Sequence, residues 1–353
     1  MKLKIEYKDF VKAYTQSFGT ALFFPQFLKL RRQGLDFKEI KEKLKNKIPE
    51  STLYFWFNNK RIPLPFNEFN KIKKEFDKSE LMQLATIVGH ILGDGGINNK
   101  LILHYCNTEQ FLINEFQNIM KNIFKAKHMN YYKEKSGIIR LQYSRLFSRI
   151  LTCIFGTFSK GGNKQITPQI ENMPVLWKAK LIQALYDDDG SVPKSGYCVA
   201  FKQKDKNIIL WVQKTLKELG INSRLTPDGS HWHLRVTNYF DILKFREKIN
   251  FSKNYRKQIQ LNKTIEKINY PHWKMKKQII EILKERPRTR KELINVLQLQ
   301  PGTVYGHLHG WKRAKRKSNL GLIDLQLVKV TKIGRINLYH INYNNLKFGE
   351  KHV

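Results

Sequence analysis

The chain has 353 residues, of which 41% are hydrophobic, so it can fold into two or three domains with proper cores and is not a disordered protein. It carries 65 lysines and arginines against 29 acidic residues, and the net charge of +36 favours a partner with many phosphates. No apolar run is long enough to cross a membrane, so we expect a soluble, cytoplasmic protein without membrane contact.

The cysteines and the start of the chain support this expectation. Cys106, Cys153 and Cys198 form no CxxC pair, so neither a zinc site nor a disulfide framework is expected. Free thiols fit a reducing compartment, and the first residues do not read as a signal peptide.

The first clear pattern in chain order is a set of short helices, after a segment over 1–24 that gives no clear prediction. Residues 25–32 and 37–44 have apolar side chains at helical spacing. Ser51 is a candidate cap for a further helix over 52–60.

Helix, short turn, helix and a basic end resemble the helix-turn-helix of site-specific recombinases and sigma-type regulators. Region 1–66 is therefore expected to bind DNA, with its second helix in a major groove. A helical cap without DNA contact is the alternative, because helical hairpins are common. The candidate contacts are Tyr54, Asn58, Asn59, Lys60 and Arg61.

A charged connector over 66–80 leads to the first copy of a repeated motif. Ile87–Gly95 reads Ile-Val-Gly-His-Ile-Leu-Gly-Asp-Gly, an apolar helical run with Gly89 at its third position and Asp94 before the last glycine. The elements predicted to follow are strands within 97–106, a helix over 108–124, strands over 128–132 and 138–143, and a helix over 144–155.

The second copy follows a linker over 156–172. Ile182–Gly190 reads Ile-Gln-Ala-Leu-Tyr-Asp-Asp-Asp-Gly, with Ala184 and Asp189 at the positions of the earlier small residue and acid. The elements predicted around it are a helix over 175–188, a strand over 197–203, a helix over 206–219, strands over 223–226 and 231–237, and a helix over 239–249.

The aspartates in these motifs point to a metal site. Glycine after a helical run is a common C-terminal stop, so Asp94 and Asp189 are expected at helix ends that are already electronegative. The small Gly89 and Ala184 would let the two helices approach closely. Two carboxylates brought together in this way favour a hard divalent cation such as Mg²⁺.

The paired motif resembles that of the LAGLIDADG homing endonucleases in their single-chain, two-motif form. The resemblance implies an α+β fold in which two αββαββα halves, near 81–158 and 173–260, form a pseudo-twofold saddle. It also implies a monomer that cuts both strands of double-stranded DNA with Mg²⁺ held by Asp94 and Asp189. One copy alone would fit an ordinary core helix before an Asp-Gly turn; two copies in register favour the family.

Basic residues near the metal site stabilise charge on the phosphate in that family. Lys164 lies in the segment before the second motif and is the first candidate for a catalytic lysine, ahead of Lys253 and Lys257. Strands in a major groove can read bases with alternate side chains, although each such residue could also be simply solvated. The candidates are His104, Tyr131, Lys133, Arg140, Gln142, Lys202, Lys204, Arg224, His233 and Arg235.

Residues 271–345 are expected to form a winged-helix-like DNA-binding domain. Helices are predicted over 275–285, 289–297 and 303–315, followed by strands over 327–330 and 336–341. On the third helix, Lys312 and Arg313 are the candidate phosphate contacts. His307 and His309 are two positions apart and so do not face the same way as a metal pair would.

Two other functions fit the same pattern. A DNA-binding transcription regulator could keep the scaffold without cutting, although both acids are present. A maturase that binds intron RNA could use the same basic surface. An intein origin is not expected, because the chain starts with Met1 and does not end in the His-Asn of a splicing block.

Overall fold

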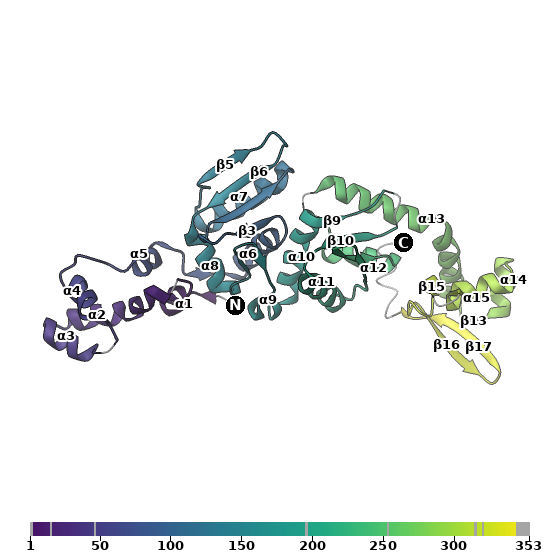
Figure 1. Cartoon of the computed structure of the whole chain (residues 1–353). Helices are drawn as coiled ribbons and strands as arrows, with labels where there is room; N and C mark the ends of the chain where they lie inside the picture. Colours follow the sequence, from purple (N-terminus) through teal and green to yellow (C-terminus); the bar gives the residue numbers. More distant parts are fainter. Residues whose placement is uncertain are drawn as a thin grey trace. The chain divides into compact units, whose positions relative to one another are not determined.

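The computed structural model describes residues 3–14, 16–45, 47–194, 197–252, 254–313, 316–319 and 321–343. The chain divides into two compact units, one made of Met1–Pro193 with Cys198–Ile259 and the other of Lys194–Tyr197 with Gln260–Val353. Figure 1 shows both and labels many of their helices and strands. Within the described part of the chain, no helix is both long and apolar enough to cross a membrane.

The first unit opens with a folded helical region. Its elements are β1 (Leu3–Lys4), α1 (Tyr7–Lys12), the 3-10 helix η1 (Gln16–Phe23), α2 (Phe24–Arg32), α3 (Phe37–Lys43), α4 (Glu50–Phe57), α5 (Leu64–Lys71) and β2 (Glu75–Phe76). Helices α2, α3 and α4 enclose an apolar cluster that includes Phe27, Ile40 and Trp56. The stretch expected to be a plain connector is folded, since it holds most of α5, and β2 pairs with β1.

The helix expected over 52–60 is shifted toward the N-terminus. It starts at Glu50, so Ser51 lies in its first turn and does not cap it. It ends before Asn59, whose left-handed backbone with φ of 54° is incompatible with a continuing helix. The predicted DNA contacts that lie beyond the helix are Asn58, Asn59, Lys60 and Arg61.

The remainder of this unit contains two copies of one arrangement (Figure 1). The first is α6 (Lys78–Leu92), β3 (Gly95–Ile97), β4 (Leu103–Asn107), α7 (Gln110–Phe124), β5 (Asn130–Lys133), β6 (Ile139–Tyr143) and α8 (Arg145–Phe155). The second is α10 (Val175–Asp189), β9 (Gly190–Ser191), β10 (Val199–Gln203), α11 (Lys206–Glu218), β11 (Arg224–Asp228), β12 (His231–Val236) and α12 (Tyr239–Lys248). The expected αββαββα order is confirmed in both halves.

Each half is built on an antiparallel four-stranded sheet. The strand orders are β3-β4-β6-β5 and β11-β12-β10-β9. Fully buried aromatic residues such as Tyr105, Phe116 and Phe201 fill the space between the sheets and their helices. This core fixes the strand ends relative to the motif helices.

The linker between the halves is also structured. It forms a hairpin of β7 (Ser159–Lys160) and β8 (Asn163–Lys164), followed by α9 (Pro168–Glu171). The amide of Gly161 donates to the carbonyl of Ile97 at 2.8 Å, and the amide of Ile97 donates to the Ser159 hydroxyl at 3.1 Å. These bonds hold the hairpin, and with it Lys164, beside β3.

The motif helices α6 and α10 pack against each other through their small residues. A Cβ atom added at Gly89 would lie 2.7 Å from the Cβ of Ala184 and would overlap the carbonyl oxygen of Leu181. Helix α6 starts with a capping box between Asp77 and Glu80, which fixes its first turn. The close packing holds the two helix ends together.

The second unit combines helices with a small sheet. Its elements are most of α13 (Tyr255–Glu285), β13 (Arg288–Thr289), α14 (Arg290–Leu297), α15 (Pro301–His309), β14 (Trp311–Arg313), β15 (Arg316–Asn319), β16 (Val328–Ile333) and β17 (Ile336–Ile341), with β13-β17-β16 forming the sheet. The helix expected over 303–315 is too long, because Gly310 with φ of 82° ends α15. Lys312 and Arg313 belong to β14 instead, and their side chains lie outside the described residues.

Replacing Gly89 tests the helix contact. We expect Gly89→Ala to lower the free energy of unfolding by about 1–3 kcal/mol, because the added methyl group overpacks the interface. Gly19→Ala is the control, since nothing lies within 4 Å of a Cβ at that position. Equilibrium denaturation compares both variants with the parent, and equal stability of the two would contradict the close approach.

Candidate active site

The two motif aspartates occupy equivalent places in the fold. Each immediately precedes the glycine that begins a short strand, Gly95 of β3 or Gly190 of β9. Asp94 follows the end of α6, and Asp189 is the last residue of α10. Both carboxylates therefore lie at helix C-termini, where the helix dipole disfavours negative charge.

A lysine compensates each helix end. The ammonium of Lys164, on β8, donates to the carbonyl of Gly93 at the end of α6. The ammonium of Lys257, in the first turn of α13, donates to the carbonyls of Asp187 at 2.6 Å and Tyr186 at 3.1 Å. Cations are stabilising at this end of a helix, so each lysine offsets the unfavourable placement of an aspartate. Lys253, the other lysine considered, lies outside the described residues.

An amide side chain completes each set. Asn107, the last residue of β4, donates from Nδ2 to Oδ2 of Asp94 at 2.9 Å. Gln203, the last residue of β10, donates from Nε2 to Oδ2 of Asp189 at 3.4 Å. Sequence reasoning missed both amides. Their common place at the end of the second strand of each half was the available signal.

The electrostatics of the cluster shift the pKa values of its members. Loss of solvent and the carboxylates of Asp188 and Asp189 raise the pKa of Asp94 to about 7, although the residue keeps an exposed surface. Burial and Asp188 raise the pKa of Asp189 to about 6. Burial lowers the pKa of both Lys164 and Lys257, against the pull of the aspartates. The ionised form of both carboxyl groups is therefore disfavoured in the folded protein.

A further carboxylate, which sequence reasoning also missed, lies beneath these groups. The side chain of Asp188 is fully buried, at 0% exposure, and lies 3.1 Å from Nδ1 of an equally buried His90. Burial alone would lower the pKa of His90, but the carboxylates of Asp188 and Glu115 outweigh it and raise the pKa to about 10. The imidazole is therefore protonated and forms an ion pair with Asp188. A histidine within an apolar run and three successive acids in the other motif were the available signals.

Comparison with known proteins identifies the scaffold. A profile of the LAGLIDADG-like domain matches residues 176–250, which contain α10 and the rest of the second half. The second half of the repeat therefore resembles a LAGLIDADG-like domain. A search among curated proteins finds no match.

Solved structures that resemble this chain include mesophilic variants of the homing endonuclease I-DmoI, with 16% identity and a TM-score of 0.39 over 49% of this chain and 97% of that one. I-DmoI in complex with DNA and Mn gives 16% identity and a TM-score of 0.39 over 49% and 98%. Full-length DUF199/WhiA from Thermatoga maritima gives 17% identity and a TM-score of 0.40 over 65% and 90%.

The donor set at the ends of α6 and α10 fits a hard divalent cation. Asp94 and Asp189 supply carboxylate oxygens, the preferred ligands of Mg²⁺, and their mutual repulsion would be relieved by a shared cation. Among the described residues, no group of three or more His, Cys, Asp or Glu side chains is arranged to hold a metal by itself. Two carboxylates leave most of the coordination shell to water and phosphate oxygens, as Mg²⁺ commonly has in phosphoryl-transfer sites.

Strand register decides which predicted contacts share a sheet face. In the first sheet Arg140 and Gln142 alternate with buried residues and so lie on the face away from the core. Tyr131 and Lys133 pair with the buried Leu141 and Ile139 and so belong to the other face, contrary to expectation. The first-sheet residues that share the open face with Arg140 are His104, Cys106, Asn130, Tyr132 and Gln142.

The second sheet has a comparable open face. Lys202 pairs with His233, and Arg235 pairs with Arg224, so these four side chains lie on one face. Lys204 follows β10 with the same alternation. Lys202 is held by Asp228 at 3.1 Å, an exposed pair that a phosphate could replace. The predicted contacts of this sheet are thus brought together, whereas those following α4 belong to the separate cluster of α2–α4.

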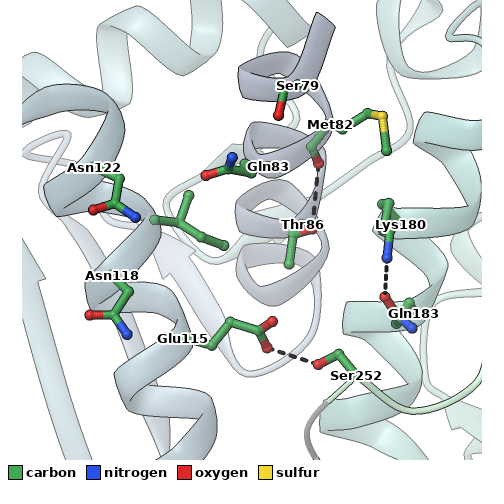
Figure 2. A pocket seen from close by; sticks show the side chains of 11 residues that line it. Ser79, Met82, Gln83, Thr86, Glu115, Asn118, Asn122, Lys180, Gln183 and Ser252 are labelled. Atoms are coloured by element: carbon green, nitrogen blue, oxygen red, sulfur yellow. Dashed lines mark hydrogen bonds between the residues drawn. The ribbon is translucent and has the colours of Figure 1, made fainter.

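A cavity of about 550 Å³ lies elsewhere, between α6, α7 and α10. Figure 2 shows its lining of amide and hydroxyl side chains, with Glu115 accepting a hydrogen bond from Ser252 at 2.9 Å. The residues that α6 contributes, Ser79 to Thr86, precede its C-terminal end by two turns. Neither Asp94 nor Asp189 lines this cavity, so it is not the site of the paired carboxylates.

The raised pKa of Asp94 has a measurable effect on stability. The folded protein retains a proton that the unfolded chain releases as pH rises from 3.8 to about 7, so stability falls across that window. Asp94→Asn removes this penalty. In EDTA the variant should melt at the parental temperature near pH 4 but above it at pH 8.

Asp228→Asn is the control, because Lys202 lowers the pKa of Asp228 and so favours its charged form. This variant should gain no stability at pH 8. If Asp94→Asn gave the same difference from the parent at both pH values, the carboxylate would not be strained in the folded protein.

Proposed function

We propose that the protein is a site-specific, metal-dependent endonuclease that cuts both strands of a DNA duplex. The observation that supports this most is the duplicated set of one aspartate, one lysine and one amide at two adjoining helix ends. Asp94, Lys164 and Asn107 form the first set, and Asp189, Lys257 and Gln203 form the second. Two chemically equal sets in one chain suit two scissile phosphates on opposite strands.

The residues of each set have separate tasks in this proposal. Asp94 and Asp189 hold the cation, and Asn107 and Gln203 fix the orientation of those carboxylates. A bound divalent cation would activate a water molecule and stabilise the leaving oxygen. Lys164 and Lys257, already fixed by helix carbonyls, supply positive charge that needs no rearrangement as charge develops on the phosphate.

The open sheet faces supply the binding surface in this proposal. Arg140 and Gln142 would contact one half of the target and Lys202, Arg224 and Arg235 the other half, through base edges and phosphates. Because one chain contains both halves, a monomer is sufficient. The helices α2–α4 and the second unit would extend the contact with the duplex as helix-turn-helix-like and winged-helix-like modules.

The acids provide the direct test of cleavage. The parent, incubated with Mg²⁺ and a randomised duplex library, should give cut ends that share one sequence. Asp94→Asn and Asp189→Asn should each reduce double-strand cutting of the selected duplex by about a hundred- to a thousand-fold, the scale lost when charge stabilisation at a reacting centre is removed. Binding without Mg²⁺ should persist, because the basic sheet faces are unchanged.

The parent separates the competing functions in the same assay. A parent that binds duplex DNA but never cuts it would support a regulator. A parent that prefers folded intron RNA to duplex DNA would support a maturase. An Asn variant that cuts at the parental rate would remove these aspartates from the reaction.

Salt dependence tests the binding surface. Each phosphate contact contributes about −0.9 to the slope of log affinity against log salt, so Arg235→Ala should make that slope shallower by about this amount. Lys214→Ala is the matched control, because Lys214 lies on α11 and pairs with Glu171 at 2.6 Å. Fluorescence anisotropy at several salt concentrations measures both slopes. Equal slopes for the two variants would place the DNA elsewhere.

A further inference from the structure

The two motif helices differ at the residue just before the aspartate. This residue is Gly93 in the first half and Asp188 in the second. A Cβ atom at Gly93 would lie 2.6 Å from Oδ2 of Asp188. The carboxylate of Asp188 therefore occupies the space that a side chain at the equivalent position of the other half would need.

The groups that receive this carboxylate all belong to the first half. Nδ1 of His90, on α6, lies 3.1 Å from Oδ2 of Asp188. The hydroxyl of Tyr105, on β4, donates to Oδ1 at 2.8 Å. Nδ2 of Asn107 lies 3.3 Å from the same oxygen. Asp188 therefore crosses from its own half into a polar pocket formed by the other.

The second half has no such pocket. The motif position of His90 is occupied there by Leu185, and the strand position of Tyr105, opposite the motif glycine, by Phe201. Both replacements are apolar and fully buried. Gly93 has no side chain that could contact the second half. The described structure therefore has a contact from Asp188 to the first half without an equivalent contact from the first half to the second.

The contact reaches the candidate catalytic groups of the first half. Nδ2 of Asn107 lies between two carboxylates, 2.9 Å from Oδ2 of Asp94 and 3.3 Å from Oδ1 of Asp188. The backbone amide of Asp94 also points to Oδ2 of Asp188, at 3.4 Å. In the second half Nε2 of Gln203 lies 3.4 Å from Oδ2 of Asp189 and contacts no second carboxylate in the described structure, while its Oε1 accepts from the backbone amide of Lys204 at 2.8 Å.

We propose that Asp188 is a positioning residue that fixes Asn107 and Asp94, so that the two halves cut their strands at unequal rates. This inference rests on the proposed endonuclease function and adds an order to its two cuts. In the first half the amide of Asn107 contacts two carboxylates and is preorganised beside Asp94, whereas the amide nitrogen of Gln203 has only a long contact with the one carboxylate of Asp189.

A purely structural role for Asp188 makes a different prediction. A buried ion pair with His90 that only joined the halves would, on removal, destabilise the protein and slow both cuts alike. A positioning role changes the ratio of the two rates. The ratio is therefore the informative quantity, since global stability affects both strands equally.

Tyr105→Phe is the principal variant, because it removes one hydroxyl, leaves the ion pair with His90 intact and copies Phe201 of the other half. Asp188→Asn is the second variant and removes the charge at constant shape. Tyr143→Phe is the matched control, since Tyr143 is a neighbouring buried tyrosine of the same sheet that makes no contact with Asp188 in the described structure. Thermal melting verifies that each protein is folded, and Tyr105→Phe carries the test if Asp188→Asn does not fold.

The experiment labels each strand of the library-selected duplex separately and measures both nicking rates in Mg²⁺ under single turnover. Tyr105→Phe should change the ratio of the two rates by about ten-fold, the effect of losing one hydrogen bond to a charged group. In metal-free protein labelled with ¹⁵N-asparagine, the side-chain amide signal of Asn107 should move in the same variants. Tyr143→Phe should change neither.

Two results would overturn the proposal, and they differ. If the parent cuts neither strand, the endonuclease function fails and this inference fails with it. If the parent cuts but Tyr105→Phe and Asp188→Asn slow both strands equally, or leave the Asn107 signal in place, the endonuclease function stands and Asp188 has no positioning role.

Discussion

The contact between Gly89 and α10 is the constraint on which the rest of the structure depends. Because no side chain separates α6 from the carbonyl of Leu181, the two helices run together to their ends. This brings Asp94 and Asp189 close enough for each to influence the protonation of the cluster. A larger residue at position 89 would separate the two carboxylates and the sheets attached to them. The close helix packing is therefore also what brings the two carboxylates together.

The close approach of the helix ends creates repulsion between negative charges, and positively charged side chains held in place by hydrogen bonds reduce it. Three carboxylates and two negative helix ends meet within a few residues, and Lys164 and Lys257 bind the exposed carbonyls while His90 pairs with the buried acid. The compensation is incomplete, since the pKa of Asp94 stays at about 7. This remaining repulsion is what a divalent cation or a positively charged group of a ligand would relieve.

Much of this could be predicted from local pattern. The repeated motif, the period of the apolar residues and the glycines after the acids were sufficient for both αββαββα halves and for the positions of Asp94 and Asp189 at helix ends. Beyond the helix contact at Gly89 and Ala184, the particular side-chain contacts between distant segments were not predicted. Asp188 meets His90 across 98 positions, and Lys257 meets Asp187 across 70, with no shared pattern in the sequence. The face of a sheet on which a side chain lies depends on the strand register, which explains why Tyr131 and Lys133 were assigned to the wrong face. The helix expected over 303–315 was too long because the sequence does not distinguish a glycine that ends a helix, such as Gly310, from one inside a helix.

The placement of Asp188 against Gly93 has a consequence for the symmetry of the molecule. In a symmetric dimer of identical subunits, one gene position would supply both residues. Two aspartates would then collide at the axis, and two glycines would leave the pocket of His90 and Tyr105 without an acid. The contact therefore requires two halves with different sequences, which a single chain containing both halves provides. Two equal halves would need changes at positions 90, 93, 105 and their partners together.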